Sequence, residues 1–279
     1  MLLNRFLIIF FIFGTGFYSS AQNYIDYLNA ANEAEHEFVE GNLDSAKKIF
    51  AALEKKYNKL KGKDYFYTGL IYYFQLDTVS GKEYLIKSAE TRLLLTNDLS
   101  KFRSKFPELN ISESTIQHIK LIEKRKIPAK EYEISDSIKA FIRLDQEDRT
   151  VPGNFDEKKD FLVQKRLLNF LQRYGMPDPY IQGEEIYTII LHVSDTMLYR
   201  LYTSYLYKEL VNGNVSPMYY CALVDRTMYR NNKQTKYLSY YPSKEIPNLS
   251  KDEILENRKK IGLSPYYQGT CVFPRIRTK

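Results

Sequence analysis

The stretch AEHEFVEGNLDSAKKIFAAL, residues 34–53, decides the fold class. Its hydrophobic residues recur at helical spacing, and Gly41 followed by Asn42 places a turn signal between two such runs. Small residues stand where two helices must approach one another, and aromatic residues stand where they interlock. The residues that carry this pattern are Ala34, Phe38, Gly41, Asn42, Ala46, Phe50 and Leu53. The stretch therefore predicts a pair of packed helices.

A second stretch, GLIYYFQLDTVSGKEYLIKS at residues 69–88, repeats the pattern. Ala34 and Gly69 are separated by 35 residues, and so are Ala46 and Gly81. Two independent small-residue positions rarely recur at one offset by chance. The other positions of the second stretch that fit the pattern are Tyr72, Tyr73, Leu85 and Ser88. We therefore expect residues 22–126 to form a stack of helices.

This pattern resembles the tetratricopeptide repeat, whose unit has about 34 residues. The resemblance covers roughly residues 25–95, but the helix-ending proline is missing and Gly81 replaces the usual alanine. It implies a concave face that holds a peptide segment of a partner; a stack that serves only as a scaffold is the alternative. Two units leave one end open, so the second half, or a helix that starts near Ser114 with a capping box over Ser114–Gln117, must cover that end.

The rest of the chain is predicted to be a mostly helical domain over residues 135–279. The run Glu123–Lys126, followed by Pro128, predicts a helix end and a linker over 127–134. Residues 219–228 fit a helix or a strand, and Asn231–Asn232 predict the turn of a small β-hairpin into 237–241. Helices are expected at 131–144, 155–173, 183–193 and 197–210, and after a capping box at Ser250–Glu253. The expected fold class is therefore mainly α.

The second half also carries six short motifs. They are Asp145-Gln146 with Arg149, Gly175 with Pro177, Gly183 with His192, Tyr220 and Ala222 with Asp225 and Arg226, Gln234 ahead of Tyr237, and Asn257-Arg258 with Gly262 and Leu263. Their order resembles a family of uncharacterised bacterial domains over residues 135–268. The run after Gln234 departs from the family pattern, which puts any shared ligand contact there in doubt. The family has no assigned activity, so the resemblance implies candidate residues and no reaction.

Charged and imidazole side chains of these motifs are predicted to meet in one polar site. A carboxylate orients a neighbouring imidazole for proton transfer, and an arginine fork binds carboxylates or phosphates. Such a site suits hydrolysis or transfer on an anionic substrate. The candidate catalytic residues are His192 as acid or base and Asp145 or Asp225 as its partner, and the candidate ligand-binding residues are Arg149, Arg226, Gln146 and Gln234. The alternative is structural: the charges tie loops together, and His192 is a hydrogen-bonded core residue.

Composition and the remaining motifs exclude several classes of protein. The chain is 44% hydrophobic and 27% charged, which is typical of a globular protein. Its 41 basic and 34 acidic residues give +7 without a basic module for nucleic acid. No G-x-S-x-G, P-loop or dinucleotide-binding turn occurs in the sequence. We expect no cofactor and no metal, because the cysteines and the scattered His36, His118 and His192 lack ligand spacing.

The first 21 residues are interpreted as a secretory signal peptide. Arg5 precedes the apolar run Phe6–Phe13, and the small residues Ser19–Ala21 favour cleavage after Ala21. A membrane anchor is the alternative, but polar residues interrupt the run early. No cysteine stands near the cut for a lipid anchor. The expected protein is exported to the periplasm or beyond the cell, with no transmembrane anchor after cleavage.

Two questions stay open at this stage. Cys221 and Cys271 form a disulfide across a 50-residue span, or they are two buried thiols. For function, the first hypothesis is an exported binding or interaction protein with a peptide or protein partner on the helical stack. The second hypothesis is a hydrolase or transferase centred on His192.

Overall fold

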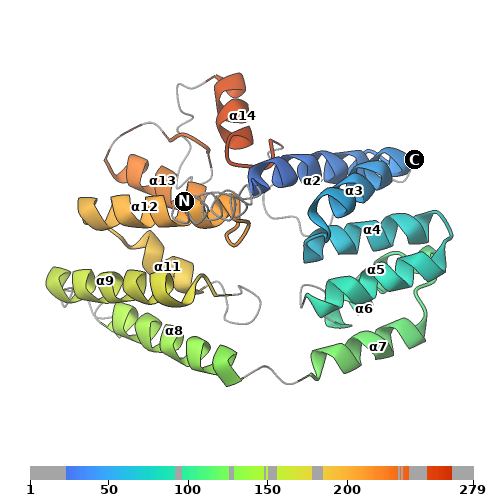
Figure 1. The fold of residues 1–279 in the computed structure, drawn as a ribbon, viewed down its shortest axis with the longest axis horizontal. Coiled ribbons are helices and arrows are strands. Elements are labelled where there is room, and N and C mark those ends of the chain that lie inside the picture. The colour runs from blue at the N-terminus through green and yellow to red at the C-terminus, as the bar shows by residue number, and fades with distance from the viewer. Residues whose placement is uncertain are drawn as a thin grey trace, which may run out of the picture.

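The computed structural model describes residues 23–91, 96–125, 129–147, 149, 156–177, 185–231, 233, 235–238 and 250–265. Among these residues every regular element is a helix and no strand occurs, which confirms the mainly α fold class. The chain descends through one series of helices and returns through a second series beside it (Figure 1). The signal-peptide prediction, residues 1–21, lies outside the described residues. None of the described helices combines the length and hydropathy needed to cross a membrane.

The first series surrounds one hydrophobic core. Its elements are α2 (Tyr24–Val39), α3 (Leu43–Tyr57), α4 (Gly62–Phe74), α5 (Thr78–Glu90), α6 (Thr96–Lys105), the 3₁₀ helix η1 (Pro107–Leu109) and α7 (Glu113–Glu123). Tyr27, Phe38, Phe50 and Tyr67 are almost fully buried in this core. Burying each large apolar side chain stabilises the fold by about 1.5–3 kcal/mol. These contacts hold the stack together without any sheet.

The turns of the first two helix pairs are built in the same way. Between α2 and α3, the amide of Asn42 donates to the carbonyl of Glu37 at 2.8 Å. Between α4 and α5, the amide of Asp77 donates to the carbonyl of Tyr72 at 2.9 Å. Both donors and both acceptors are displaced by 35 residues, the offset at which the small residues recur. The two helix pairs are therefore equivalent at their turns.

The predicted close approach of helices at small residues is confirmed. A Cβ added at Gly69 would lie 3.1 Å from the carbonyl oxygen of Gly81, and one added at Gly81 would lie 2.6 Å from the Tyr73 ring. Ala34 and Ala46 are fully buried at the equivalent positions. Helices α4 and α5 thus pack too tightly at this point for a larger side chain.

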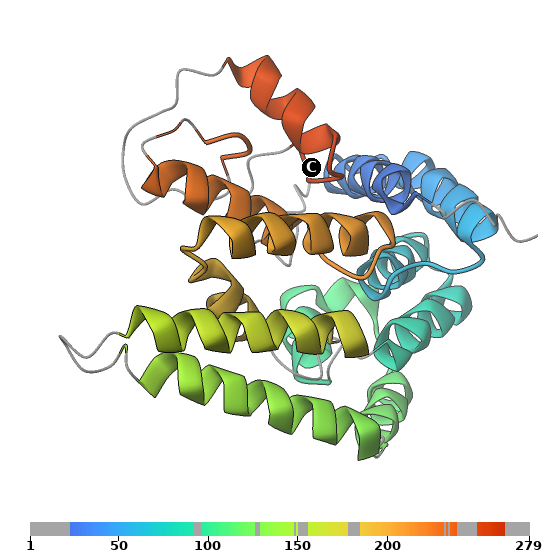
Figure 2. The same cartoon turned by 60° about the vertical axis from the view of Figure 1, so that its left-hand side comes forward.

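The second series has two core clusters of its own, separate from the core of the first series. Its helices are α8 (Ala129–Glu147), α9 (Glu157–Tyr174), α11 (Glu185–Leu191), α12 (Thr196–Val211), α13 (Pro217–Arg230) and α14 (Lys251–Lys259). Helices α9 and α12 run side by side and in parallel (Figure 2). The Tyr202 hydroxyl donates to the carbonyl of Gln164 at 2.7 Å, and the Tyr205 hydroxyl donates to the carbonyl of Leu171 at 2.9 Å. Tyrosine hydroxyls therefore join the two helices at two levels.

Two predicted boundaries are wrong. Helix α8 begins at Ala129, so the linker expected over 127–134 is helical from its third residue onward. A proline just before a helix fits this start, because its missing amide is not needed there. The expected capping box over Ser114–Gln117 is also displaced: Ser112 caps α7, and its Oγ accepts from the amide of Thr115 at 3.3 Å.

Other sequence predictions for the second half have mixed outcomes. The capping box of Ser250 and Glu253 is present at the start of α14. Residues 219–228 are helical, within α13. The β-hairpin is not supported, since residues 235–238 carry no strand and residues 239–241 lie outside the described residues.

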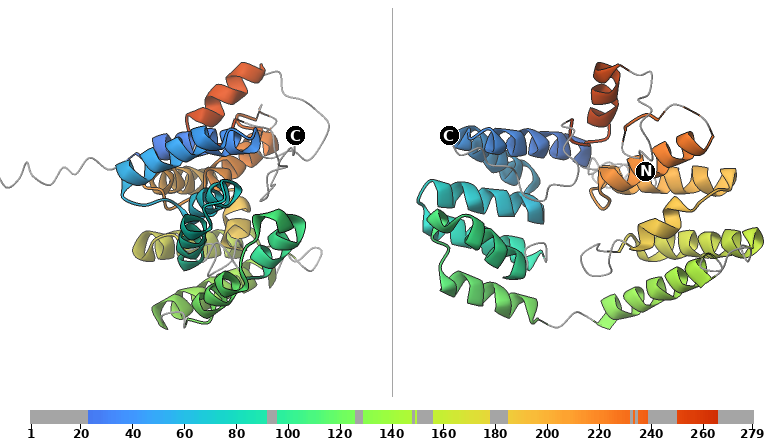
Figure 3. Two further views of the ribbon diagram at one scale, coloured as in Figure 1. Left: turned by 90° about the vertical axis from the view of Figure 1, so that its right-hand side faces the viewer. Right: turned by 180° about the vertical axis from the view of Figure 1, so that it is seen from behind.

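The two series join where α2 packs against the end of α14 (Figure 3). Asn29 donates from Nδ2 to the carbonyl of Lys259 at 2.9 Å. Asn32 donates from Nδ2 to the carbonyl of Gly262 at 3.1 Å. The last carbonyls of a helix lack partners within the helix, so these amides satisfy groups that would otherwise need water.

A second junction lies at the end of α12. Lys61, just before α4, donates from Nζ to the carbonyl of Gly213 at 2.7 Å. Gly213 has a φ of +79°, and a Cβ there would lie 2.6 Å from the Tyr24 ring. Glycine is needed at this turn for its conformation and for the space that Tyr24 of α2 occupies. The first helix is thus held by the ends of two helices from the second series.

Candidate functional site

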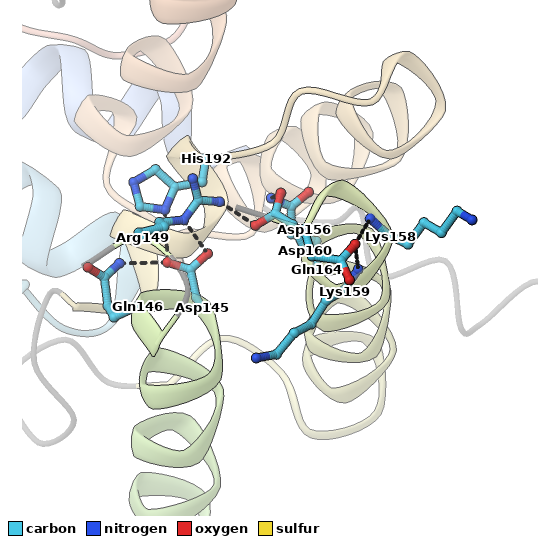
Figure 4. A network of polar contacts seen from close by, with 9 residues as sticks. All are labelled: Asp145, Gln146, Arg149, Asp156, Lys158, Lys159, Asp160, Gln164 and His192. Atoms are coloured by element: carbon cyan, nitrogen blue, oxygen red, sulfur yellow. Dashed lines mark hydrogen bonds and ion pairs between the residues drawn. The ribbon is translucent and has the colours of Figure 1, made fainter. Parts of the chain in front are cut away.

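The end of α8 and the turn after α11 bring Asp145 and His192 together (Figure 4). The Nδ1 atom of His192 lies 2.9 Å from Oδ2 of Asp145. The Asp145 side chain is fully buried, whereas 15% of the His192 side chain is exposed. The structure places His192 one residue beyond α11, not on the helix as the sequence predicted. The ring is therefore held from the interior and still reaches solvent.

Hydrogen bonding defines how the ring is oriented. An ionised carboxylate only accepts hydrogen bonds, so the contact with Asp145 assigns the proton to Nδ1 of His192. Gln146 donates from Nε2 to the same Oδ2 at 2.6 Å, which fixes the carboxylate from a second direction. A neutral imidazole with its proton on Nδ1 has an unprotonated Nε2 on its opposite edge. That nitrogen can accept a proton.

Arg149 joins this pair to α9. Its Nε donates to Oδ1 of Asp145 at 3.3 Å, and its Nη2 forms an ion pair with Asp160. Asp160 lies in the first turn of α9, where a helix N-terminus favours negative charge. The guanidinium thereby bridges the end of one helix and the start of the next. Of the predicted site residues, the structure brings Asp145, Arg149, His192 and Gln146 together.

The sequence did not indicate three members of the network, which are Asp160, Gln164 and Tyr202. Gln164 donates from Nε2 to Oδ2 of Asp160 at 2.9 Å, and its carbonyl accepts from the buried Tyr202. A usable signal was present, because Asp160 and Gln164 are polar residues four positions apart on the buried face of an amphipathic helix. Polar groups at such positions need partners inside the fold.

Burial and charge move the two carboxyl groups of the network in opposite directions. Burial raises the pKa of Asp145, but the hydrogen bond and charge of His192 together with Arg149 outweigh it, so the pKa lies below its ordinary value. Burial also raises the pKa of Asp160, and there the opposing effect of Arg149 is smaller, so the pKa stays raised. Asp145 is therefore the ionised partner of the imidazole.

Asp225, the other candidate partner of His192, belongs to a second buried cluster. Its Oδ1 accepts from the amides of Lys236 and Tyr237 at 2.8 and 3.0 Å. Arg258 on α14 donates from Nη1 to the carbonyl of Tyr237 at 2.9 Å. These contacts fasten the segment after α13 to α14. They support the structural interpretation of Asp225. None of these contacts involves His192, so they do not support the prediction that Asp225 orients its ring.

The remaining candidates can be placed only in part. Arg226 lies on α13 next to Asp225. Gln234 and Cys271 lie outside the described residues, so the disulfide prediction stays open. Cys221 is buried on α13, and its Sγ donates to the carbonyl of Met218 at 3.1 Å. No group of three or more His, Cys, Asp or Glu side chains among the described residues could hold a metal ion.

Comparison of the chain with protein-family models, with curated proteins and with solved structures found no match. The resemblance of residues 25–95 to tetratricopeptide repeats and that of residues 135–268 to the uncharacterised bacterial domains therefore stay predictions.

Proposed function

We propose that the protein is a hydrolase or transferase in which His192 transfers a proton and Asp145 orients the ring. The observation that carries this proposal is the 2.9 Å contact between His192 Nδ1 and a fully buried carboxylate, on a ring that is 15% exposed. A positioned imidazole accelerates such reactions by about 100- to 10,000-fold, because its proton affinity suits neutral pH. A histidine sealed in the core would not support this role.

Arg149 has a positioning role in this proposal. Its guanidinium is engaged by Asp145 and Asp160, so it holds the two carboxylates in place. Binding of an anionic substrate, which the sequence analysis assigned to Arg149, then falls to other groups.

A panel of nitrophenyl esters of carboxylic and phosphoric acids tests the proposal. We expect turnover of at least one ester, and His192→Gln should lower that turnover by at least about 100-fold. Asp145→Asn should lower it as well. His118→Gln is the matched control, because His118 is exposed on α7, and it should leave turnover unchanged. Equal turnover by His192→Gln and the wild type would contradict the proposal.

A second measurement does not depend on the choice of substrate. Nitrogen-15 NMR of the imidazoles distinguishes a proton on Nδ1 from a proton on Nε2. The neutral ring of His192 should carry its proton on Nδ1 in the wild type, and Asp145→Asn should reduce that preference. A proton found on Nε2 in the wild type would remove the acceptor that the mechanism needs.

The second candidate function is that of an exported interaction protein. A specific observation favours it: Leu76 and Val79, at the turn between α4 and α5, are 85% and 79% exposed. The tetratricopeptide-like interpretation of residues 22–126 fits a surface that binds a peptide or another protein. Both functions are compatible, because the exposed turn and the His192 site lie on different helices.

Export is a separate prediction of this proposal. After expression with the complete sequence in a bacterium, the protein should be found outside the inner membrane and begin at Gln22. Mass spectrometry of the intact chain measures this directly. A chain that keeps Met1–Ala21, or that stays in the cytoplasm, would contradict the signal-peptide interpretation.

A further inference from the structure

Asp160 lies outside the group of residues that the sequence predicted, yet both oxygens of its carboxylate are engaged. Oδ1 forms the ion pair with Nη2 of Arg149, and Oδ2 accepts from Nε2 of Gln164 at 2.9 Å. The Asp160 side chain is 8% exposed, whereas that of Arg149 is 22% exposed. Both contacts are made by donors, which is the geometry of an ionised carboxylate. Asp160 is therefore held as a negative charge at the start of α9.

The support of Asp160 extends into the core of the second series. The backbone carbonyl of Gln164 accepts from the hydroxyl of Tyr202 on α12 at 2.7 Å. Tyr202 is fully buried, and Gln164 is almost fully buried. Side chains that are fixed by packing and hydrogen bonds position the groups they contact. A chain of contacts thus runs from α12 through α9 to Arg149.

Arg149 is shared between two carboxylates, those of Asp145 and Asp160 (Figure 4). Its Nε lies 3.3 Å from Oδ1 of Asp145, at the long end of hydrogen-bond distances. Nε2 of Gln146 and Nδ1 of His192 lie closer to Asp145, at 2.6 and 2.9 Å. Ionised Asp160 attracts the guanidinium toward α9, and this attraction is stronger in the interior than in water. Asp145 therefore keeps negative charge for the imidazole.

The charges of this network do not cancel while the ring of His192 is neutral. Asp145 and Asp160 contribute two negative charges and Arg149 contributes one positive charge, so the network carries one excess negative charge. The charged ring of His192 acts to lower the pKa of Asp160, against the larger effect of burial, which raises it. This interaction is mutual, because opposite charges favour the charged form of both groups. Asp160 therefore stabilises the imidazolium that forms when His192 takes up a proton.

We propose that Asp160 is a positioning residue for His192 and that it acts through Arg149. This inference rests on the proposed function, since it assigns Asp160 a part in the proton transfer by His192. The two oxygens of Asp160 are taken by Arg149 and Gln164, so its influence reaches the ring through the guanidinium. Loss of its charge lets Arg149 turn toward Asp145. The guanidinium then neutralises the acceptor of the Nδ1 proton and weakens its hold on the ring.

The tautomer of His192 tests this role without any substrate. At a pH where the ring is neutral, nitrogen-15 NMR measures the ratio of rings protonated at Nδ1 to rings protonated at Nε2, and His192→Gln identifies the signal. Asp160→Asn removes the charge and keeps the shape of the side chain. It should lower the ratio at least about twofold, the smallest effect of a typical hydrogen bond. A purely structural role of Asp160 would leave the ratio of the folded protein unchanged.

Glu157→Gln is the matched control for this measurement. Glu157 also lies in the first turn of α9, but its side chain is exposed. The control removes the same charge near the same helix end, and it should not change the ratio. Asp160→Glu and Asp160→Gln repeat the comparison with two side chains of equal size, which keeps the test valid if Asp160→Asn does not fold. Of these two variants, only Asp160→Gln should lower the ratio.

A second background tests whether Asp160 acts through Arg149. In Arg149→Met the guanidinium is absent, so Asp160→Asn should change the tautomer ratio much less than it does in the wild type. The coupling between the two positions follows from the four proteins of this cycle. An equal fall of the ratio with and without Arg149 would overturn the proposal, and so would an unchanged ratio in both Asp160→Asn and Asp160→Gln.

Ester turnover provides the arm that depends on catalysis. Asp160→Asn should lower kcat about 10- to 100-fold, the range found when an outer partner of a metal-bound histidine is lost. KM should change little, because Asp160 supports the proton transfer and not the binding of substrate. A wild type without turnover would contradict the proposed function and leave the tautomer measurement as the test of Asp160. A wild-type ring protonated at Nδ1 whose tautomer ratio does not respond to Asp160→Asn or Asp160→Gln would overturn this inference alone.

Discussion

Replacing Asp145 with alanine should lower the free energy of unfolding by about 3 kcal/mol, the cost of breaking a buried ion pair. The Asp145 side chain is fully buried and accepts from Gln146, Arg149 and His192. Its removal leaves these donors without their acceptor in the interior. Urea unfolding followed by circular dichroism measures the loss. Asp136→Ala, at an exposed position on the same helix, is the control and should change little, whereas an equal loss in both variants would contradict this prediction.

The effect of Asp145→Asn should depend on pH in a definite direction. The pKa of Asp145 is lowered in the folded protein, so its charge stabilises the fold above the ordinary value of about 3.9. That contribution is lost as the pH falls through the folded value. The pKa of Asp160 is raised and acts in the opposite sense, but it is present in both proteins and largely cancels in the comparison. A stability difference that is the same at pH 7 and near pH 3 would be inconsistent with an ionised Asp145.

Replacing Gly213 with alanine should cost about 3 kcal/mol, because two effects add. The positive φ strains an alanine by about 1 kcal/mol, and forcing a methyl group into a packed site costs about 1–3 kcal/mol more. The added Cβ would lie 2.6 Å from the Tyr24 ring. Gly41→Ala is a matched control, because its φ is +84° and nothing lies within 4 Å of the added Cβ.

A double variant separates the contact from the backbone strain. Replacing Tyr24 with alanine removes the ring that the new methyl group meets, so Gly213→Ala should then cost about as much as Gly41→Ala. Urea unfolding of the four proteins of this cycle measures the coupling. If Gly213→Ala costs the same with and without Tyr24, the close packing of α2 on this turn is not what destabilises the variant.

Local sequence signals predicted the helices more accurately than the places where they meet. The helix expected at 197–210 is found at Thr196–Val211, because Asp195 and Asn212 mark its ends in the sequence. The close approach of α4 and α5 was predictable from Gly69 and Gly81. Helix α7 started earlier than expected because Ser112, Ser114 and Thr115 offer competing caps. Local rules do not choose among such neighbours.

The sequence predicted several residues of the candidate site, but it did not predict which of them would contact one another. The spacing of Asp145 and Arg149, one helical turn apart, is visible in the sequence. Their contacts with His192, 47 residues away from Asp145, and with Asp160 depend on how α8, α9 and α11 pack. Asp225 looked equivalent to Asp145, because each carboxylate has an arginine within four residues, Arg226 and Arg149. Tertiary packing instead places backbone amides against Asp225, which no local pattern indicates.

The contacts of Asn29 and Asn32 with the end of α14 join residues that are 230 positions apart. During synthesis the first helix therefore emerges long before its last partners exist. Contacts between residues so far apart in the sequence form slowly, because a large loop must close first. The native arrangement of α2 can be completed only when the chain has been released almost to its end. This delay fits the export proposed from the sequence, in which a chain passes through a translocation channel before it folds.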